Sequence, residues 1–124
     1  MSEKKSILKE RSFQFSIRVI TIYKYLKESK KEFVLSKQLL RSGTAVGALI
    51  REAQNAESKN DFIHKLAIAQ KECDETMYWL ELLKETEYLE ENEFMITHKE
   101  ADAILKMIRS AILTTKQNLI KQKT

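Results

Sequence analysis

The chain has 124 residues, a formal net charge of +4 and an apolar content of 43%, which suits one globular domain with a substantial core. It contains no proline, two glycines and a single cysteine, so an intrachain disulfide is excluded and few turns are expected. No apolar run is long enough for a membrane span or a signal peptide. We therefore expect one cytoplasmic domain over residues 1–124, with no membrane association.

Apolar residues recur at alternating steps of four and three, which is the spacing of one buried face of an α-helix. Residues 7–28 form the first predicted helix, with a seam of Leu8, Ser12, Phe15, Val19, Ile22 and Leu26. Residues 34–56 form the second, with a seam of Leu35, Leu39, Ser42, Val46, Leu49, Ala53 and Ala56. Gly43 and Gly47 each cost about 1 kcal/mol in a helix relative to alanine, so a close helix contact is expected there.

The third predicted helix covers residues 59–88, with Ser58 as its N-cap and a seam of Phe62, Leu66, Ala69, Cys73, Thr76, Leu80 and Leu83. An acidic break, ETEYLEENEF, follows it. Thr97 and Glu100 then match a capping box, which predicts the fourth helix over residues 97–120. Four long helices with short connections pack most simply as an all-α, up-down-up-down antiparallel four-helix bundle.

Candidate catalytic and metal-binding groups are few. The two histidines, His64 and His98, lack the paired acid-x-x-His motifs of a di-iron bundle. One cysteine and two unpaired histidines also do not suit a zinc site. Cys73 lies on an apolar seam beside Ala69 and Thr76, without an activating base, and is predicted to be a core residue. We therefore expect no cofactor, no metal and no enzymatic activity.

The charges are segregated along the sequence. Residues 1–31 hold nine basic and three acidic side chains, residues 61–100 hold four and eleven, and residues 101–124 hold five and one. In an up-down bundle both termini share one end with the connection between the second and third helices. That end is therefore predicted to be positive, and a positive surface suits phosphate backbones through counterion release. Ordinary solubilising charge is the alternative interpretation.

The candidate nucleic-acid contacts are basic residues on the surfaces that flank the seams: Lys4, Lys5, Lys9, Arg11, Arg18, Arg41, Arg51, Lys65, Lys116 and Lys121. A second set of apolar residues remains after the seams are filled: Phe13, Ile17, Ile20, Ile63, Met77 and Trp79. Two interpretations stay open for this set. It is either a wider core face or the interface of a homo-oligomer.

Three segments together resemble a known family. They are QLLRSGT at residues 38–44, Ala-x-Ser-x-x-Asp-Phe-Ile from Ala56 to Ile63, and Glu-Thr-x-Tyr-Trp-Leu from Glu75 to Leu80. This combination is similar to the 23S rRNA-intervening-sequence proteins, and the likeness extends over about residues 15–116. Many relatives have Asn at the position of Leu49, so any polar contact made there is absent from this chain.

The resemblance implies a four-helix protomer that assembles into a ring-like homopentamer, encoded within insertions in bacterial large-subunit ribosomal RNA genes. A related branch serves diversity-generating retroelements as an accessory protein that binds a reverse transcriptase and nucleic acid. The family supplies no catalytic residues. We therefore expect a non-enzymatic, oligomeric protein that binds RNA or DNA through its backbone. The alternative is a protein-interaction scaffold, such as an accessory partner of a reverse transcriptase or another RNA enzyme.

Overall fold

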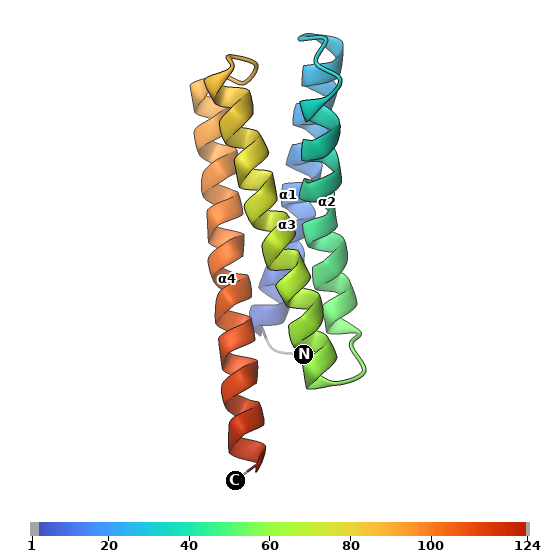
Figure 1. The fold of residues 1–124 in the computed structure, drawn as a ribbon, viewed down its shortest axis with the longest axis vertical. Helices are drawn as coiled ribbons and strands as arrows, with labels where there is room; N and C mark the ends of the chain where they lie inside the picture. The colour runs from blue at the N-terminus through green and yellow to red at the C-terminus, as the bar shows by residue number, and fades with distance from the viewer. Residues whose placement is uncertain (1–2, 124) are drawn as a thin grey trace.

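The computed structural model describes residues 3–123, and the side chains of residues 7–122. It contains four helices: α1 (Glu3–Glu28), α2 (Leu35–Gln54), α3 (Lys59–Glu85) and α4 (Glu91–Lys123). Successive helices alternate in direction, so both termini and the α2–α3 turn lie at one end (Figure 1). Each helix packs on the next, and contacts between α1 and α4 close the bundle. The predicted all-α four-helix bundle is thus confirmed.

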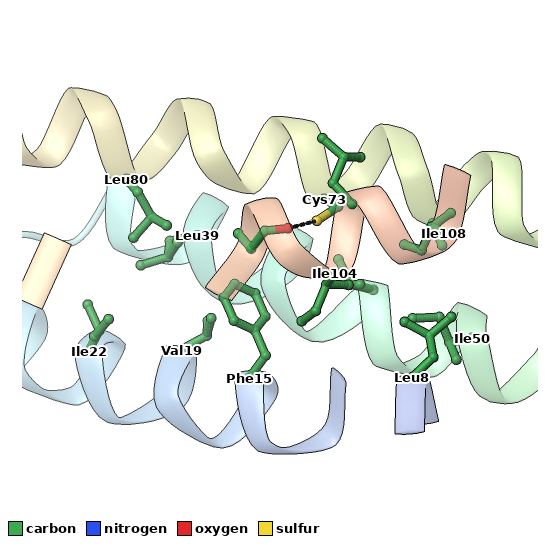
Figure 2. Close-up of a cluster of buried hydrophobic side chains, with 14 of the residues drawn as sticks. Leu8, Phe15, Val19, Ile22, Leu39, Ile50, Cys73, Leu80, Ile104 and Ile108 are labelled. Carbon is green, nitrogen blue, oxygen red and sulfur yellow. Dashed lines mark hydrogen bonds between the residues drawn. The ribbon is translucent and has the colours of Figure 1, made fainter. Parts of the chain in front are cut away.

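The predicted seams form the core of the bundle. On α3 every seam residue from Phe62 to Leu83 is buried, and Figure 2 shows seam side chains of the four helices converging on one cluster. Two positions on α2 differ from the prediction, because Ser36 and Ile50 are buried whereas Leu35 and Leu49 are half-buried. The difference at Leu49 arises because a straight helix drifts by about 20° in each heptad relative to a strict seven-residue repeat.

Gly43 and Gly47 allow α2 to approach α1 closely, as predicted. A β-carbon at Gly43 would lie 2.8 Å from both γ-carbons of Val19, and one at Gly47 would lie 3.2 Å from the carbonyl oxygen of Ser12. Val19 is fully buried, and its branched side chain has little freedom to turn aside. The contact at Gly43 is therefore the tighter of the two.

Glu32 provides the N-terminal cap of α2. Its carboxylate accepts backbone hydrogen bonds from Ser36 at 2.7 Å, Leu35 at 3.1 Å and Val34 at 3.3 Å, and the residue is only 9% exposed. Burial raises the pKa of Glu32, but the hydrogen bonds from Ser36, Leu35 and Val34 outweigh it and lower the pKa below its usual range. The cap therefore depends on an ionised carboxylate.

The chain leaves α3 without using glycine. Glu87 adopts a left-handed conformation, with φ of 66°, at a position that helix ends usually give to glycine. The N–H of Tyr88 bonds to the carbonyl of Leu83 at 2.9 Å, and the N–H of Glu87 bonds to that of Lys84 at 3.0 Å. Lys31 is likewise left-handed, with φ of 56°. These two residues explain how the chain turns where the sequence shows no strong turn former.

The predicted start of the fourth helix at Thr97 is wrong, because α4 begins at Glu91. Thr97 is buried inside the helix, where its hydroxyl donates to Oε2 of Glu93 at 3.0 Å. Glu91 and Glu93 occupy the first turn, where carboxylates are stabilised by the helix dipole. Part of the acidic break is therefore helical. By contrast, the predicted cap of α3 is confirmed, since Ser58 Oγ accepts from the N–H of Asp61 at 3.0 Å.

We expect the substitution Gly43→Ala to destabilise the fold. Overpacking against Val19 costs about 1–3 kcal/mol, whereas replacing glycine within a helix returns only about 1 kcal/mol. Gly47→Ala is the matched control, because its milder contact should leave stability within about 1 kcal/mol of the parent. Urea unfolding followed by circular dichroism measures both. A Gly43→Ala protein as stable as the parent would contradict the close-packing role.

We expect Glu32→Gln to lower stability at neutral pH by about 1–2 kcal/mol, because the ionised cap is lost. The pKa of Glu32 is lower in the folded than in the unfolded chain. Its stabilisation is therefore complete above the unfolded value of about 4.3 and disappears as the pH falls through the folded value. Unfolding free energies of parent and variant should converge in strong acid. Glu28→Gln, at an exposed position, is the control, and an equal loss there would argue against the cap.

Candidate nucleic-acid interface

Two of the predicted basic contacts, Arg11 and Arg18, connect α1 to α4. The guanidinium of Arg11 pairs with both carboxylate oxygens of Glu100, at 3.0 Å from Nε and 2.8 Å from Nη2. Nη1 of Arg18 lies 2.6 Å from Oε2 of Glu93. The hydrogen bonds to Glu100 raise the pKa of Arg11, because they favour its charged form. Both cations are therefore balanced by a carboxylate of the same chain.

Arg41 makes a similar connection between α2 and α3. Its Nη1 lies 3.2 Å from both carboxylate oxygens of Glu72, and its Nη2 lies 2.6 Å from Oε1 of Glu75. The same oxygen of Glu75 accepts a hydrogen bond from Nε1 of Trp79 at 3.2 Å. Hydrogen bonds with Glu72 and Glu75 raise the pKa of Arg41. This arrangement fixes the register of two helices within a segment that carries the family resemblance.

Lys65 is the fourth predicted contact with an acidic partner, since its Nζ lies 3.2 Å from Oε1 of Glu52. By contrast, Lys9, Arg51 and Lys116 are exposed and form no ion pair with any residue that the structure describes. An exposed cation without a carboxylate partner is the kind of group that can neutralise a phosphate. The predicted set thus divides into cations that connect helices and cations that face solvent.

The unpaired cations lie at the end of the bundle that holds both termini and the α2–α3 turn (Figure 1). Lys121 is also exposed there, on the last turns of α4. The side chains of Lys4 and Lys5 lie outside the described residues. Lys59 shares this end, and the sequence-based list omitted it. Its place at the first position of α3, directly after the turn, is the signal that identifies it. We call this the basic end.

The opposite end of the bundle carries both signs of charge, with the exposed lysines Lys27, Lys30 and Lys31 at the α1–α2 connection and carboxylates at the α3–α4 connection. The exposed carboxylates of the α3–α4 connection are Glu85, Glu87, Glu90 and Glu91. Lys84 offsets part of this charge, with its Nζ 3.5 Å from Glu85 and 3.4 Å from Glu91. A polyanion is therefore repelled mainly by the α3–α4 connection and attracted to the unpaired cations of the basic end.

A groove of about 720 Å³ runs between α1 and α2 near the basic end. Phe13, Ile20 and Gly47 contribute apolar or bare surface to it. Its charged lining consists of three cations and three carboxylates: Lys9, Arg51, Lys65, Glu52, Glu57 and Asp61. Because these charges balance, the groove offers little net attraction to a polyanion. Lys65 is paired with Glu52, whereas Lys9 and Arg51 have no ion-pair partner among the described residues, so phosphate contacts are expected at these two cations rather than along the whole groove.

The residues predicted for an oligomer interface separate into two groups. One lies on α1, where the exposed fractions are 49% for Phe13, 44% for Ile17 and 38% for Ile20. α1 and α3 are not neighbouring helices in the bundle, since their described backbones do not approach closely, so the two groups do not form a single continuous surface. The second group consists of the half-buried α3 residues Ile63, Met77 and Trp79. Of these, Met77 and Trp79 pack partly against the core, as a wide core face would.

Two of the groups that could carry catalysis, Cys73 and His98, are engaged in a core and a surface contact respectively. Cys73 is buried, and its thiol donates to the carbonyl of Ala101 at 3.2 Å (Figure 2). Burial, followed by the charges of Asp74 and Asp102, raises the pKa of Cys73 to about 12, so the reactive thiolate is scarce at neutral pH. His98 lies 2.8 Å from Glu81 at the surface. Within residues 3–123, no cluster of three or more metal-ligating side chains is present.

No helix in the described chain is long and apolar enough to cross a membrane. No curated protein matches the chain. A solved structure does, a protein of unknown function from the S23 ribosomal protein family of Bacteroides thetaiotaomicron VPI-5482. The two sequences are 48% identical, the match covers 88% of this chain and 97% of the other, and the TM-score is 0.87. The family model of the 23S rRNA-intervening sequence protein matches residues 4–110. The chain therefore belongs to the 23S rRNA-intervening sequence protein family.

Proposed function

We propose that this protein is a non-enzymatic, oligomeric protein that binds RNA or DNA through the phosphate backbone, using its basic end. One observation carries this function: Lys9, Arg51 and Lys116 are exposed at one end of the bundle and have no acidic partner within the described residues. At the opposite end, the α3–α4 connection carries four exposed carboxylates, those of Glu85, Glu87, Glu90 and Glu91. The family takes its name from an intervening sequence of 23S rRNA, which agrees with a nucleic-acid ligand.

Recognition of this kind carries little sequence information. Lysine presents a compact charge rather than a planar fork, so it meets a phosphate without fixing a particular base. Arg51 has a planar guanidinium that could read a base edge. It lies in the last turn of α2, at the same end as the lysines, and we expect it to contact phosphates together with them. The binding energy should therefore come mainly from counterion release, which is shared by RNA and DNA.

Oligomerisation would strengthen this binding. Phe13, Ile17 and Ile20 form an apolar stripe on α1 that is too exposed to serve the core, and such stripes are typical of subunit contacts. In a head-to-tail ring this stripe meets a different surface of the next protomer. Parallel protomers would then place every basic end on one rim, where their contacts with a single nucleic acid add together.

We expect the triple substitution Lys9→Gln, Arg51→Gln and Lys116→Gln to weaken binding of a duplex and to flatten its salt dependence. The slope of log K against log salt should fall by about 0.9 for each phosphate contact removed. Fluorescence anisotropy with a labelled DNA or RNA duplex across a salt series measures this slope. The matched control is the triple substitution Lys24→Gln, Lys30→Gln and Lys37→Gln, which removes the same charge from exposed positions toward the other end.

Absence of binding at low salt would exclude the nucleic-acid function. An equal effect of both triple substitutions would show that net charge, rather than the basic end, determines the affinity.

We expect Ile17→Glu to dissociate the oligomer while the protomer stays folded. Ile17 is exposed in the protomer, so a carboxylate costs little there, whereas burying that charge in a subunit contact is strongly unfavourable. Light scattering gives the mass of each species, and circular dichroism checks the fold. Val34→Glu is the control, because Val34 is 71% exposed and lies away from the stripe. A monomeric parent, or an unchanged mass for Ile17→Glu, would contradict the α1 interface.

A further inference from the structure

Two exposed stripes lie on diagonally opposite helices of the bundle. α1 packs against α2 and α4, whereas its described backbone does not approach that of α3, so the outer faces of α1 and α3 point in opposite directions. The first stripe, the α1 outer stripe, extends the exposed apolar residues of α1 in both directions at four-three steps: Glu10, Phe13, Ile17, Ile20, Lys24 and Lys27. The second, the α3 outer stripe, contains every exposed residue of α3 from 67 to 85: Ala67, Lys71, Asp74, Tyr78, Glu81 and Glu85.

Contacts inside the bundle show which parts of the two stripes lie at the same height along its axis. Val19 fills the space beside Gly43, because a β-carbon there would lie 2.8 Å from both of its γ-carbons. The preceding residue, Ser42, has its hydroxyl oxygen 2.9 Å from that of Thr76. Val19 on α1 and Thr76 on α3 therefore lie at the same height. Because α1 and α3 run in the same direction (Figure 1), residues equally far along the chain from this pair also stay level.

The side chains of the two outer stripes are complementary within the same turn. One level pair is apolar and two join a lysine of α1 to a glutamate of α3: Ile20 with Tyr78, Lys24 with Glu81, and Lys27 with Glu85. Tyr78 is 54% exposed, so its ring is available to a partner. Among the described residues Glu81 pairs with His98 through Oε2 alone, at 2.8 Å. Nearer the basic end the signs are reversed, with Glu10 on α1 and Lys71 on α3.

The other two helices do not offer this match to the α1 outer stripe. Beyond its first turn, the exposed charges of α4 within the described residues are all basic: Lys99, Lys106, Arg109, Lys116 and Lys121. On α2 three exposed charges are basic and one is acidic: Lys37, Arg41, Arg51 and Glu52. Both helices would therefore present mainly like charge to Lys24 and Lys27, which disfavours the contact.

We propose that the α1 outer stripe of one copy packs against the α3 outer stripe of a second, parallel copy. The four-three spacing on both helices suits knobs-into-holes packing, with Ile17, Ile20 and Tyr78 at its centre. Since the two stripes face opposite sides, each copy can bind one neighbour through α1 and another through α3, which is a head-to-tail arrangement. This inference rests on the oligomer of the proposed function and names the surface that its α1 residues contact.

Charge reversal with rescue tests the pairing. Lys24→Glu places a carboxylate opposite Glu81 and should raise the dissociation constant of the oligomer at least about tenfold. Glu81→Lys should do the same, and the double reversal should restore assembly. Lys24→Gln removes one exposed pair without repulsion and should have a much smaller effect. Lys30→Glu is the matched control, because Lys30 is exposed outside the stripe. Analytical ultracentrifugation over a concentration series measures assembly, and circular dichroism checks the fold.

The apolar part of the contact is tested at Tyr78. Tyr78→Glu should dissociate the oligomer as Ile17→Glu does. Leu113→Glu should leave the mass unchanged, because Leu113 is 58% exposed on α4 and receives the same charge outside the contact. Oxidation of a double variant, Ile20→Cys with Tyr78→Cys, should give covalent multimers of three or more copies. Each single-cysteine variant should remain uncrosslinked, since the native Cys73 is buried.

Several results would overturn the proposed contact. Assembly that is unchanged by both single charge reversals, or that the double reversal fails to restore, would exclude the pairing of Lys24 with Glu81. Dissociation by Leu113→Glu but not by Tyr78→Glu would identify α4 as the partner surface, and crosslinking of a single-cysteine variant would identify a two-fold contact. A monomeric parent would contradict the oligomer as a whole, whereas an oligomer that depends on Ile17 but not on Tyr78 would overturn this pairing alone.

Discussion

The close approach of α1 and α2 is the constraint on which the rest of the bundle depends. At Gly43 the two helices are so near that Val19 fills the space a β-carbon would need. This contact sets the first hairpin, and the second hairpin packs onto it through α2 and α3. The approach at Gly47 leaves the bare surface that contributes to the groove between α1 and α2. One pair of small residues thus shapes both the core and the outer surface near the basic end.

Charge has two separate uses in this structure. Arg11 and Arg18 connect α1 to α4, Arg41 connects α2 to α3, and each is balanced by glutamates of the facing helix. Exposed ion pairs of this kind add little stability individually, but their geometry favours one register of neighbouring helices. By contrast, Lys9, Arg51 and Lys116 at the basic end form no ion pair with a described residue, so their charges are available to a phosphate backbone. Lys59 belongs to this second class.

Most of the fold followed from periodicity. The α3 seam from Phe62 to Leu83 was predicted completely, because every fourth or third residue along a helix returns to the same face. The start of α4 was not predicted, since Thr97 and Glu100 imitate a capping box inside a continuous helix. The carboxylates of Glu91 and Glu93 suit both an acidic loop and a helical first turn, and local sequence does not separate these two states.

By itself the sequence determined the number of helices, their buried faces, the polarity of charge along the bundle and the family. Only the tertiary structure decided which cations are available, because Arg11 and its partner Glu100 lie 89 residues apart and no local pattern pairs them. It also decided where the apolar surface stays exposed. The sequence placed Phe13 and Trp79 in one set of apolar residues outside the seams. In the structure Phe13 faces solvent on α1, whereas Trp79, on α3, packs partly against the core. Exposure depends on which helices are neighbours, and helical spacing describes each helix alone.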